Sequence, residues 1–231
     1  MFAAATFVLS AAFLVSAGRP LSLKHGTRLN NSSLTNDLAA EVQMQERFAS
    51  SQSALDHFSA SPLRKHALYV HCDANQIIQI VQAFKIAQKY ADSSYNHLKS
   101  NPSGSDLYTK WFGSFDTDRY NRVLKSFNRL RVYPSQFTYK CTCTKQKVIS
   151  KVKQHEYGIV NLCPNFWILN VDGIYSRAFS IIREGTRFSK VLGTHNHNLT
   201  YAGSMTLAVK SPTKAIYNAN NHAYFSLDTH T

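Results

Sequence analysis

The four cysteines constrain the fold of this 231-residue chain more than any other feature of its sequence. Cys141 and Cys143 are separated by a single residue, so they cannot bond to each other without severe strain, and each needs a distant partner. Cys72 and Cys163 are the only partners that the sequence offers. Two pairings remain open at this point, Cys72–Cys141 with Cys143–Cys163 or the crossed arrangement. A structural zinc site built from the four thiolates is the alternative to disulfides.

The first 18 residues have the pattern of a secretory signal peptide. An apolar run from Phe2 to Val15 is followed by small residues at positions 16–18, and the run is too short to span a membrane. No later stretch reaches 18 uninterrupted apolar residues. We therefore expect a secreted, extracellular protein without a transmembrane segment, whose cysteines pair in an oxidising compartment. A buried N-terminal helix is the alternative interpretation of the run.

Residues 19–65 differ in composition from the rest of the chain. They are rich in Ser, Asn and Ala, and they contain no Cys, Trp or Tyr, which predicts a weakly folded pro-segment or disordered leader. Arg64 and Lys65 form a dibasic pair just before the composition changes. This pair suggests processing there, although the segment could also stay attached. The folded domain is then expected to span residues 66–231.

Two hydrophobic periods alternate within residues 66–231. A helical period predicts helices over residues 75–98 and 116–130, which should pack together, and further helices over 176–192, 202–211 and 211–227. Between residues 137 and 166 the period changes to two, which predicts a small antiparallel sheet that carries three of the four cysteines. The expected fold class is therefore α+β with helices dominant.

Four segments of this domain resemble a known family in their order and spacing: WFGSF (111–115), CTCT (141–144), YGIVNLCPNFW (157–167) and PTKAIYNANNHAYF (212–225). They are similar to the secreted fungal metalloendopeptidases of the deuterolysin, or aspzincin, group, and most closely to its peptidyl-lysine branch. The similarity covers roughly residues 68–228. It implies a zincin-like fold, zinc as the cofactor of active members, and the pairing Cys72–Cys141 with Cys143–Cys163.

The family's chemistry depends on a helix bearing His-Glu-x-x-His, whose two imidazoles hold zinc while the Glu acts as general base. The matching segment here reads IIREGTRF, with Arg183 and Arg187 at the two His positions and Glu184 retained. Arginine has no lone pair for a metal, and its fixed positive charge repels one. The resemblance thus implies that two zinc ligands are lost and that Glu184 is an idle general base.

The remaining family positions fall in two other segments. In the loop GTHNHNLTYAG (193–203), Asn196 stands at the third zinc ligand, an Asp in the family, and Leu199 stands at the Tyr that assists the oxyanion. Tyr201 could replace that Tyr only if the loop were shifted by two residues. Asn220 occupies the position of the Asp that receives the substrate's Lys side chain in the lysine-specific branch.

These replacements predict a pseudoprotease that holds no cofactor and acts by binding. Glu184 could pair with Arg187, three residues away on the same helix face, and this pair could link to Asn196. Alternatively, both arginines point into solvent. His195 and His197 offer a second alternative, in which they and Glu184 form an atypical metal site of an active endopeptidase.

The charge of the chain points to an acidic partner. The formal net charge is +13, and ten basic residues, called here the basic region, lie between positions 119 and 153: Arg119, Arg122, Lys125, Arg129, Arg131, Lys140, Lys145, Lys147, Lys151 and Lys153. Such a cluster is compatible with RNA, an anionic host glycan or an acidic host protein. The alternative is a solvated basic surface. We expect the protein to be a monomer.

Overall fold

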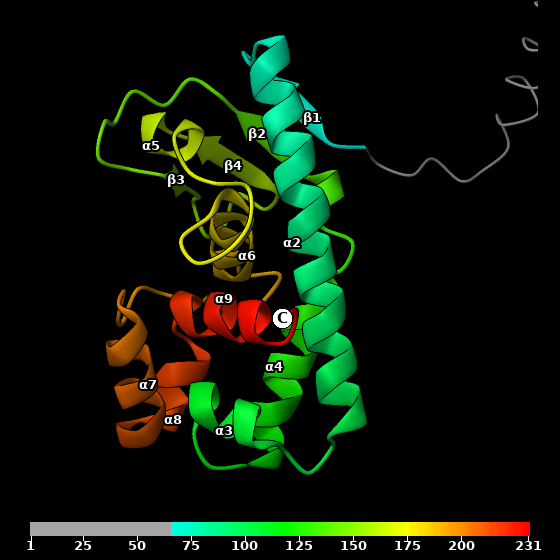
Figure 1. Cartoon of the computed structure of the whole chain (residues 1–231), viewed down its shortest axis with the longest axis vertical. Helices are drawn as coiled ribbons and strands as arrows, with labels where there is room; N and C mark the ends of the chain where they lie inside the picture. Colours follow the sequence, from blue (N-terminus) through cyan, green and yellow to red (C-terminus); the bar gives the residue numbers. More distant parts are fainter. Residues whose placement is uncertain (1–65) are drawn as a thin grey trace, which may run out of the picture. The chain divides into compact units, whose positions relative to one another are not determined.

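The computed structural model describes residues 66–231 (Figure 1). The expected signal peptide (1–18) and leader (19–65) lie outside the described residues. No helix between residues 66 and 231 is long and apolar enough to cross a membrane.

The first two expected helices are present and pack together. Helix α2 (Ala74–Ser100) begins with a capping box, in which the side chain of Asp73 accepts from the backbone of Gln76 and the side chain of Gln76 accepts from the backbone of Asp73. Helix α4 (Thr117–Leu130) is capped by Asp116. The facing sides of both helices enter one apolar core. The 3.6-residue period therefore located both helices correctly.

The remaining helices are shorter. They are α3 (Asp106–Phe112), the 3₁₀ helix η1 (Pro134–Gln136), α5 (Pro164–Trp167), α6 (Arg177–Arg187), α7 (Tyr201–Lys210), α8 (Pro212–Ile216) and α9 (Ala219–Asp228). Helix α6 ends five residues before the expected end at residue 192. The cause is Phe188, whose extended backbone (φ −62°, ψ 132°) turns its fully buried ring against Phe137 and Tyr157.

The expected antiparallel sheet is wrong, because most of the sheet is parallel. Its strands are β1 (Leu68–Val70), β2 (Thr138–Lys140), β3 (Ser150–Lys151) and β4 (Ile159–Leu162), in the order β1-β2-β4-β3. Strands β1 and β4 pair with β2 in parallel, and only β3 and β4 are antiparallel. The helices between β1 and β2 carry the chain back to the starting end of the sheet, which makes this pair parallel.

Two disulfides join the ends of these strands. Cys72 bonds to Cys141 (S–S 1.99 Å) and Cys143 bonds to Cys163 (S–S 2.01 Å), so the pairing is the one implied by the resemblance and not the crossed one. The C-T-C segment follows the end of β2 instead of lying within a strand. Its two cysteines therefore reach separate partners on β1's side and on β4's side of the sheet.

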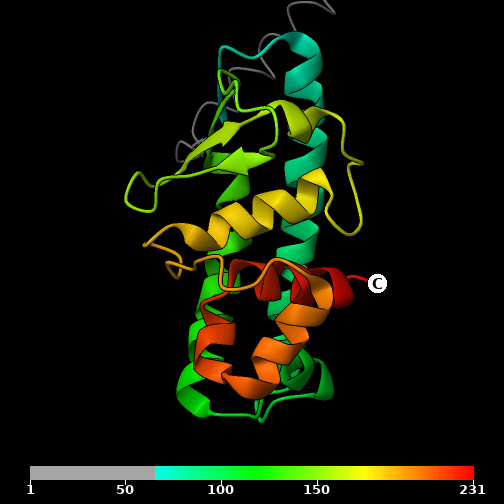
Figure 2. The same cartoon turned by 90° about the vertical axis from the view of Figure 1, so that its left-hand side faces the viewer.

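Helix α6 occupies the centre of the domain. Figures 1 and 2 show it crossing between the sheet and helix α9, while α2 runs alongside all three. Its residues from Ala178 to Thr186 are buried except Arg183, which is half-buried. A helix in this position can present side chains to the sheet and to α9 at once, which makes it the natural place for a site.

Gly113, in the WFGSF segment, allows α3 to end directly against α7 and α8. Its φ is +83°, and a Cβ at this position would lie 2.4 Å from the carbonyl oxygen of Ala208 and 2.6 Å from Cγ of Pro212. Gly113→Ala should therefore lower the free energy of unfolding by about 3 kcal/mol, measured by urea denaturation. Gly173→Ala is the matched control, because Gly173 also has a positive φ (+96°) but no atom within 4 Å of the added Cβ. Equal losses in the two variants would contradict the role of close packing at Gly113.

Candidate functional site

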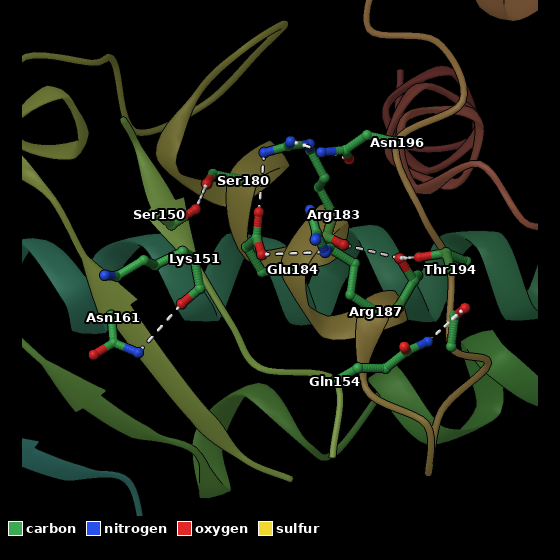
Figure 3. Close-up of polar contacts among 12 residues, drawn as sticks. Ser150, Lys151, Gln154, Asn161, Ser180, Arg183, Glu184, Arg187, Thr194 and Asn196 are labelled. Atoms are coloured by element: carbon green, nitrogen blue, oxygen red, sulfur yellow. Dashed lines mark hydrogen bonds and ion pairs between the residues drawn. The ribbon is translucent and has the colours of Figure 1, made fainter. Parts of the chain in front are cut away.

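The candidate site lies where α6 meets the loop at residues 193–199 and the start of α9 (Figure 3). Ser176 caps α6 by accepting from the backbone N–H of Phe179. Side chains three or four residues apart share one side of a helix. Ser180 therefore lies one turn before Arg183 and Glu184, and Arg187 lies one turn after them. The three positions marked by the degenerate zinc motif are therefore close together in space.

Glu184 is a buried carboxylate held between two guanidinium groups. Its Oε1 accepts a hydrogen bond from Nη1 of Arg183 at 3.0 Å. Its Oε2 lies 3.7 Å from Nε of Arg187, which is an ion-pair distance but too long for a hydrogen bond, and Oε2 has no hydrogen-bond partner within residues 66–231. Burial raises the pKa of Glu184, and the two arginines oppose this rise. The expected ion pair with Arg187 is present, but Arg183 makes the shorter contact.

Arg183 links the positions to which the resemblance assigned functional roles. Besides its bond to Glu184, its Nε donates to Oδ1 of Asn220 at 2.9 Å and its Nη2 donates to Oδ1 of Asn196 at 3.2 Å. The link was expected to pass through Arg187, which instead contacts Glu184 alone among these residues. The alternative that both arginines point into solvent is wrong, because their side chains are only 18% and 27% exposed.

The loop that carries Asn196 is fixed at both ends. At its start, Thr194 bonds through both its backbone and its hydroxyl to Thr186 near the end of α6. Further on, His195 forms a parallel bridge with Asn218, and the side chain of Asn218 accepts from the backbone of His197 and of Asn198. The sequence analysis did not predict a role for Asn218. The only indication in the sequence was that Asn218 belongs to the NANN segment.

The residues of the site do not fit zinc. Two of the positions that should supply imidazoles supply guanidinium groups, and these already surround the one carboxylate. His195 and His197 are exposed, with ring centroids 6.0 Å apart. Within residues 66–231, no three His, Cys, Asp or Glu side chains come close enough together to hold a metal ion. An ion placed at Glu184 would face two fixed positive charges.

The two candidates for the oxyanion position make no hydrogen bond to Glu184 within residues 66–231. Leu199 is 55% exposed, and its backbone carbonyl accepts from the side chain of Asn220 at 2.6 Å. Tyr201 begins α7, and its ring packs against Trp111 and Tyr224 with centroid distances of 5.0 and 5.3 Å. No hydrogen bond joins Tyr201 to Glu184 in the described part of the chain. Tyr201 therefore belongs to an aromatic cluster rather than to the ion-pair network.

A pocket of about 340 Å³ opens beside Arg183, and we call it the Arg183 pocket. Arg183 and Asn220 line it together with side chains from three other segments, the stretch before and into β3, the start of α6, and Leu199. Sequence reasoning missed Lys147, Ser150, Tyr175 and Phe179 as pocket residues. The family motif identified Arg183 and Asn220, and none of these four residues belongs to that motif.

The basic region is divided between elements, and several of its cations have acidic neighbours. Arg131 pairs with Asp92 and Lys153 with Glu156, each at 2.6 Å. A second pocket, of about 430 Å³, has both charges in its lining from α4, the acid Asp118 and the cations Arg122, Lys125 and Arg129. The other lysines lie on β2, on β3 and in the connection between them. More cations of the basic region have acidic partners than the sequence suggested.

Comparison with known proteins identifies the family. A family model described as lysine-specific metallo-endopeptidase matches residues 97–227. The peptidyl-Lys metalloendopeptidase of Pleurotus ostreatus is 37% identical over 161 residues, which are 69% of this chain and 96% of that protein. The peptidyl-Lys metalloendopeptidase of Armillaria mellea is 32% identical over 194 residues, and these cover 83% of this chain but only 55% of that relative.

The fold agrees with these matches. The structure of a zinc peptidase from Grifola frondosa superposes with a TM-score of 0.65 at 30% identity, covering 68% of this chain and 97% of that one. The expected helix-dominated zincin-like fold with two disulfides is thus confirmed, apart from the direction of its strands. The chain belongs to the aspzincin family.

Proposed function

We propose that this protein is a secreted, non-catalytic member of the aspzincin family that acts by binding. One observation carries the proposal: a single guanidinium group, that of Arg183, bonds to Glu184, Asn196 and Asn220. These are the positions that the family resemblance assigns to the general base, a zinc ligand and the recognition of lysine. A fixed cation of the protein thus supplies positive charge where the family uses a metal.

The chemistry of the network argues against peptide hydrolysis. A general base must accept a proton from an activated water molecule, but Glu184 is buried and engaged by Arg183 and Arg187. Within residues 66–231, no three His, Cys, Asp or Glu side chains come together to bind zinc. A lysine side chain would find no carboxylate at Asn220, whose Oδ1 already accepts from Arg183, and the positive charge of Arg183 would repel it.

The second candidate function is an active endopeptidase with an atypical metal site. His195 and His197 favour it, since both imidazoles are exposed on the loop next to the network. Partial desolvation by neighbouring atoms and the nearby His195 and Lys214 lower the pKa of His197, which keeps its ring neutral and able to bind a metal near neutral pH. The two functions differ in whether the protein carries zinc.

Metal analysis of the purified full chain, prepared without chelator, tests the proposal. We expect far less than one zinc per chain and no cleavage of a lysine-containing peptide. The triple variant Arg183→His, Arg187→His and Asn196→Asp should recover zinc binding before activity, because Leu199 and Asn220 still lack the oxyanion and lysine-recognition groups.

The control for that experiment adds histidines elsewhere. Arg177→His with Lys210→His introduces two imidazoles outside the network, so zinc bound by this variant would report adventitious binding. Equimolar zinc in the natural chain, together with proteolysis that a chelator abolishes, would show that the active-enzyme alternative is correct.

The same network predicts how stability depends on each arginine. Arg183→Met leaves the carboxylate of Glu184 buried without its hydrogen-bonded partner, and it should lower the free energy of unfolding at pH 7 by about 3 kcal/mol. Arg187→Met removes only the 3.7 Å contact and should cost about 1 kcal/mol. Loss of Arg183 raises the pKa of Glu184 further, so the deficit should shrink as the pH falls and the carboxyl takes up a proton. Urea unfolding at pH 7 and pH 5 measures both effects, and equal costs for the two arginines would contradict the ranking.

The basic region is proposed as a second binding surface, for a sulfated glycan. Two sets of replacements compare its parts: Arg122 and Lys125 on α4, and Lys145, Lys147, Lys151 and Lys153 around β3, each changed to Ser. We expect each set to weaken binding of a sulfated oligosaccharide at low salt, and binding by the natural chain to fall steeply as salt rises. If neither set of replacements changed the affinity for the sulfated oligosaccharide, the basic region would be a solvated surface.

A further inference from the structure

We propose that the Arg183 pocket binds the carboxylate of an acidic side chain, presented by a peptide segment of a partner protein. This inference rests on the proposed function, because it assigns a ligand to a site that no longer holds zinc. It is argued from the charge of the pocket, the hydrogen bonds left open in it, its shape and the strand at its border.

The charge of the pocket is positive. Its eleven lining residues include two cations, Arg183 and Lys147, and no Asp or Glu. The nearest acid in the network, Glu184, does not line the pocket and is already held between two arginines. Lys147 is exposed and can attract an anion to the entrance, whereas Arg183 is largely buried and can bind it once inside.

Hydrogen-bond donors remain free in the lining of the pocket. A guanidinium group carries five N–H bonds, and three of those on Arg183 go to Asn220, Glu184 and Asn196. Within residues 66–231 the other two, one on each terminal nitrogen, have no acceptor. Ser150 and Ser180 also line the pocket, and their hydroxyls share one hydrogen bond of 2.5 Å, which leaves the second hydroxyl proton available. Two N–H groups and a hydroxyl suit the two oxygens of a carboxylate.

The shape of the pocket favours a side chain with a polar end and an apolar stem. Several polar groups of its lining are buried, with Asn220 only 3%, Ser180 4% and Ser150 7% exposed, beside the buried ring of Phe179 at 2%. Its exposed lining, called here the rim, consists of the cation Lys147 and the apolar side chains of Leu199 and Tyr175, which are 55% and 44% exposed. A glutamate side chain suits this arrangement, because its methylene groups would contact the rim while its carboxylate reaches the hydrogen-bond donors. The volume of about 340 Å³ accommodates one such side chain.

The rim is held in place before any ligand binds. Tyr175 has a left-handed backbone conformation (φ 55°), which is uncommon for an aromatic residue and costs roughly 1 kcal/mol or more. Its hydroxyl hydrogen-bonds to that of Tyr224 at 2.8 Å, and Tyr224 also lies 3.2 Å from the carbonyl of Leu199. The bond from Asn220 to the same carbonyl joins this rim to the inner polar group. Such a preorganised pocket loses little conformational entropy on binding.

The neighbouring strand indicates a peptide as the occupant. Residues 148–150 line the pocket and lead into β3, which lies at one edge of the sheet. On the side away from β4, the backbone of β3 has no strand partner within the described residues. An extended peptide can bond to such an edge through its main chain and place alternate side chains in an adjacent pocket. A small free carboxylate would make no use of this edge.

The test is an NMR titration of the purified full chain with peptides that are blocked at both ends and differ at one central residue. We expect a Glu-containing peptide to bind at least about tenfold more tightly than its Gln counterpart, because charge-assisted hydrogen bonds are lost with Gln, and the Lys counterpart to be weaker still. Shifted resonances should include those of Leu199, Tyr175 and Asn220. A Gln peptide with a free C-terminal carboxylate distinguishes an acidic side chain from a chain end.

Two Asn→Asp variants serve as matched partners in this test. Asn220→Asp keeps the acceptor for Arg183 and nearly the same volume, but it removes the donor to the carbonyl of Leu199 and adds a negative charge inside the pocket, so it should abolish the preference for Glu. Asn170→Asp adds the same charge on an exposed loop residue outside the pocket and should leave the preference unchanged. Because neither change removes the ion pair of Glu184, the comparison does not depend on variants of Arg183, which are expected to lose stability.

Three results would overturn the inference: equal affinities for the Glu and Gln peptides, a free C-terminus that replaces the acidic side chain without loss, or a Glu preference that survives Asn220→Asp. The zinc content of the same sample separates this inference from the proposed function. A zinc-free chain without Glu preference overturns the inference alone, whereas zinc-loaded protein overturns the proposed function whatever the peptides show.

Discussion

The burial of one carboxylate determines the arrangement of the whole site. Glu184 lies in the middle of α6, where that helix is covered by the sheet on one side and by α9 on the other. A charge in this position requires a partner of opposite sign, and the chain provides two arginines on the same helix. The side chain of Arg183 must then lie toward α9 and the loop, where Asn220 and Asn196 accept its other bonds. The pocket beside Arg183 depends on this orientation.

The sequence predicted those parts of the fold whose cause is local. The apolar period of α2 and of α4 acts within one helix, so both helices could be located without any knowledge of the tertiary structure. The disulfide pairing was predicted only through the family resemblance, because the spacing alone left the crossed pairing open. Strand direction was predicted wrongly, because β1 was not expected and because β2 and β4 pair in parallel although β3 lies between them in the sequence. These strands are two to four residues long and carry no local signal for such long-range pairings.

The sequence indicated which residues lie in the candidate site, but not which hydrogen bonds join them. Motif positions identified Arg183, Glu184, Asn196 and Asn220, and the structure brings all four together. Which arginine would make the link could not be deduced, since positions 183 and 187 are both within one helical turn of Glu184. That choice depends on the location of the loop, which Thr186 and Asn218 fix from two different elements. The pocket walls come from further segments that carry no motif.

The ion-pair network also couples substitutions at the two arginine positions. Replacing Arg183 or Arg187 alone removes one cation from Glu184, while the other arginine keeps its contact with the same carboxylate. The costs of the two replacements are therefore not additive, because both residues share one partner. A single imidazole at either position would weaken the compensation of the buried charge without completing a set of metal ligands. The charges on this helix thus favour substitutions that occur together over substitutions that occur one at a time.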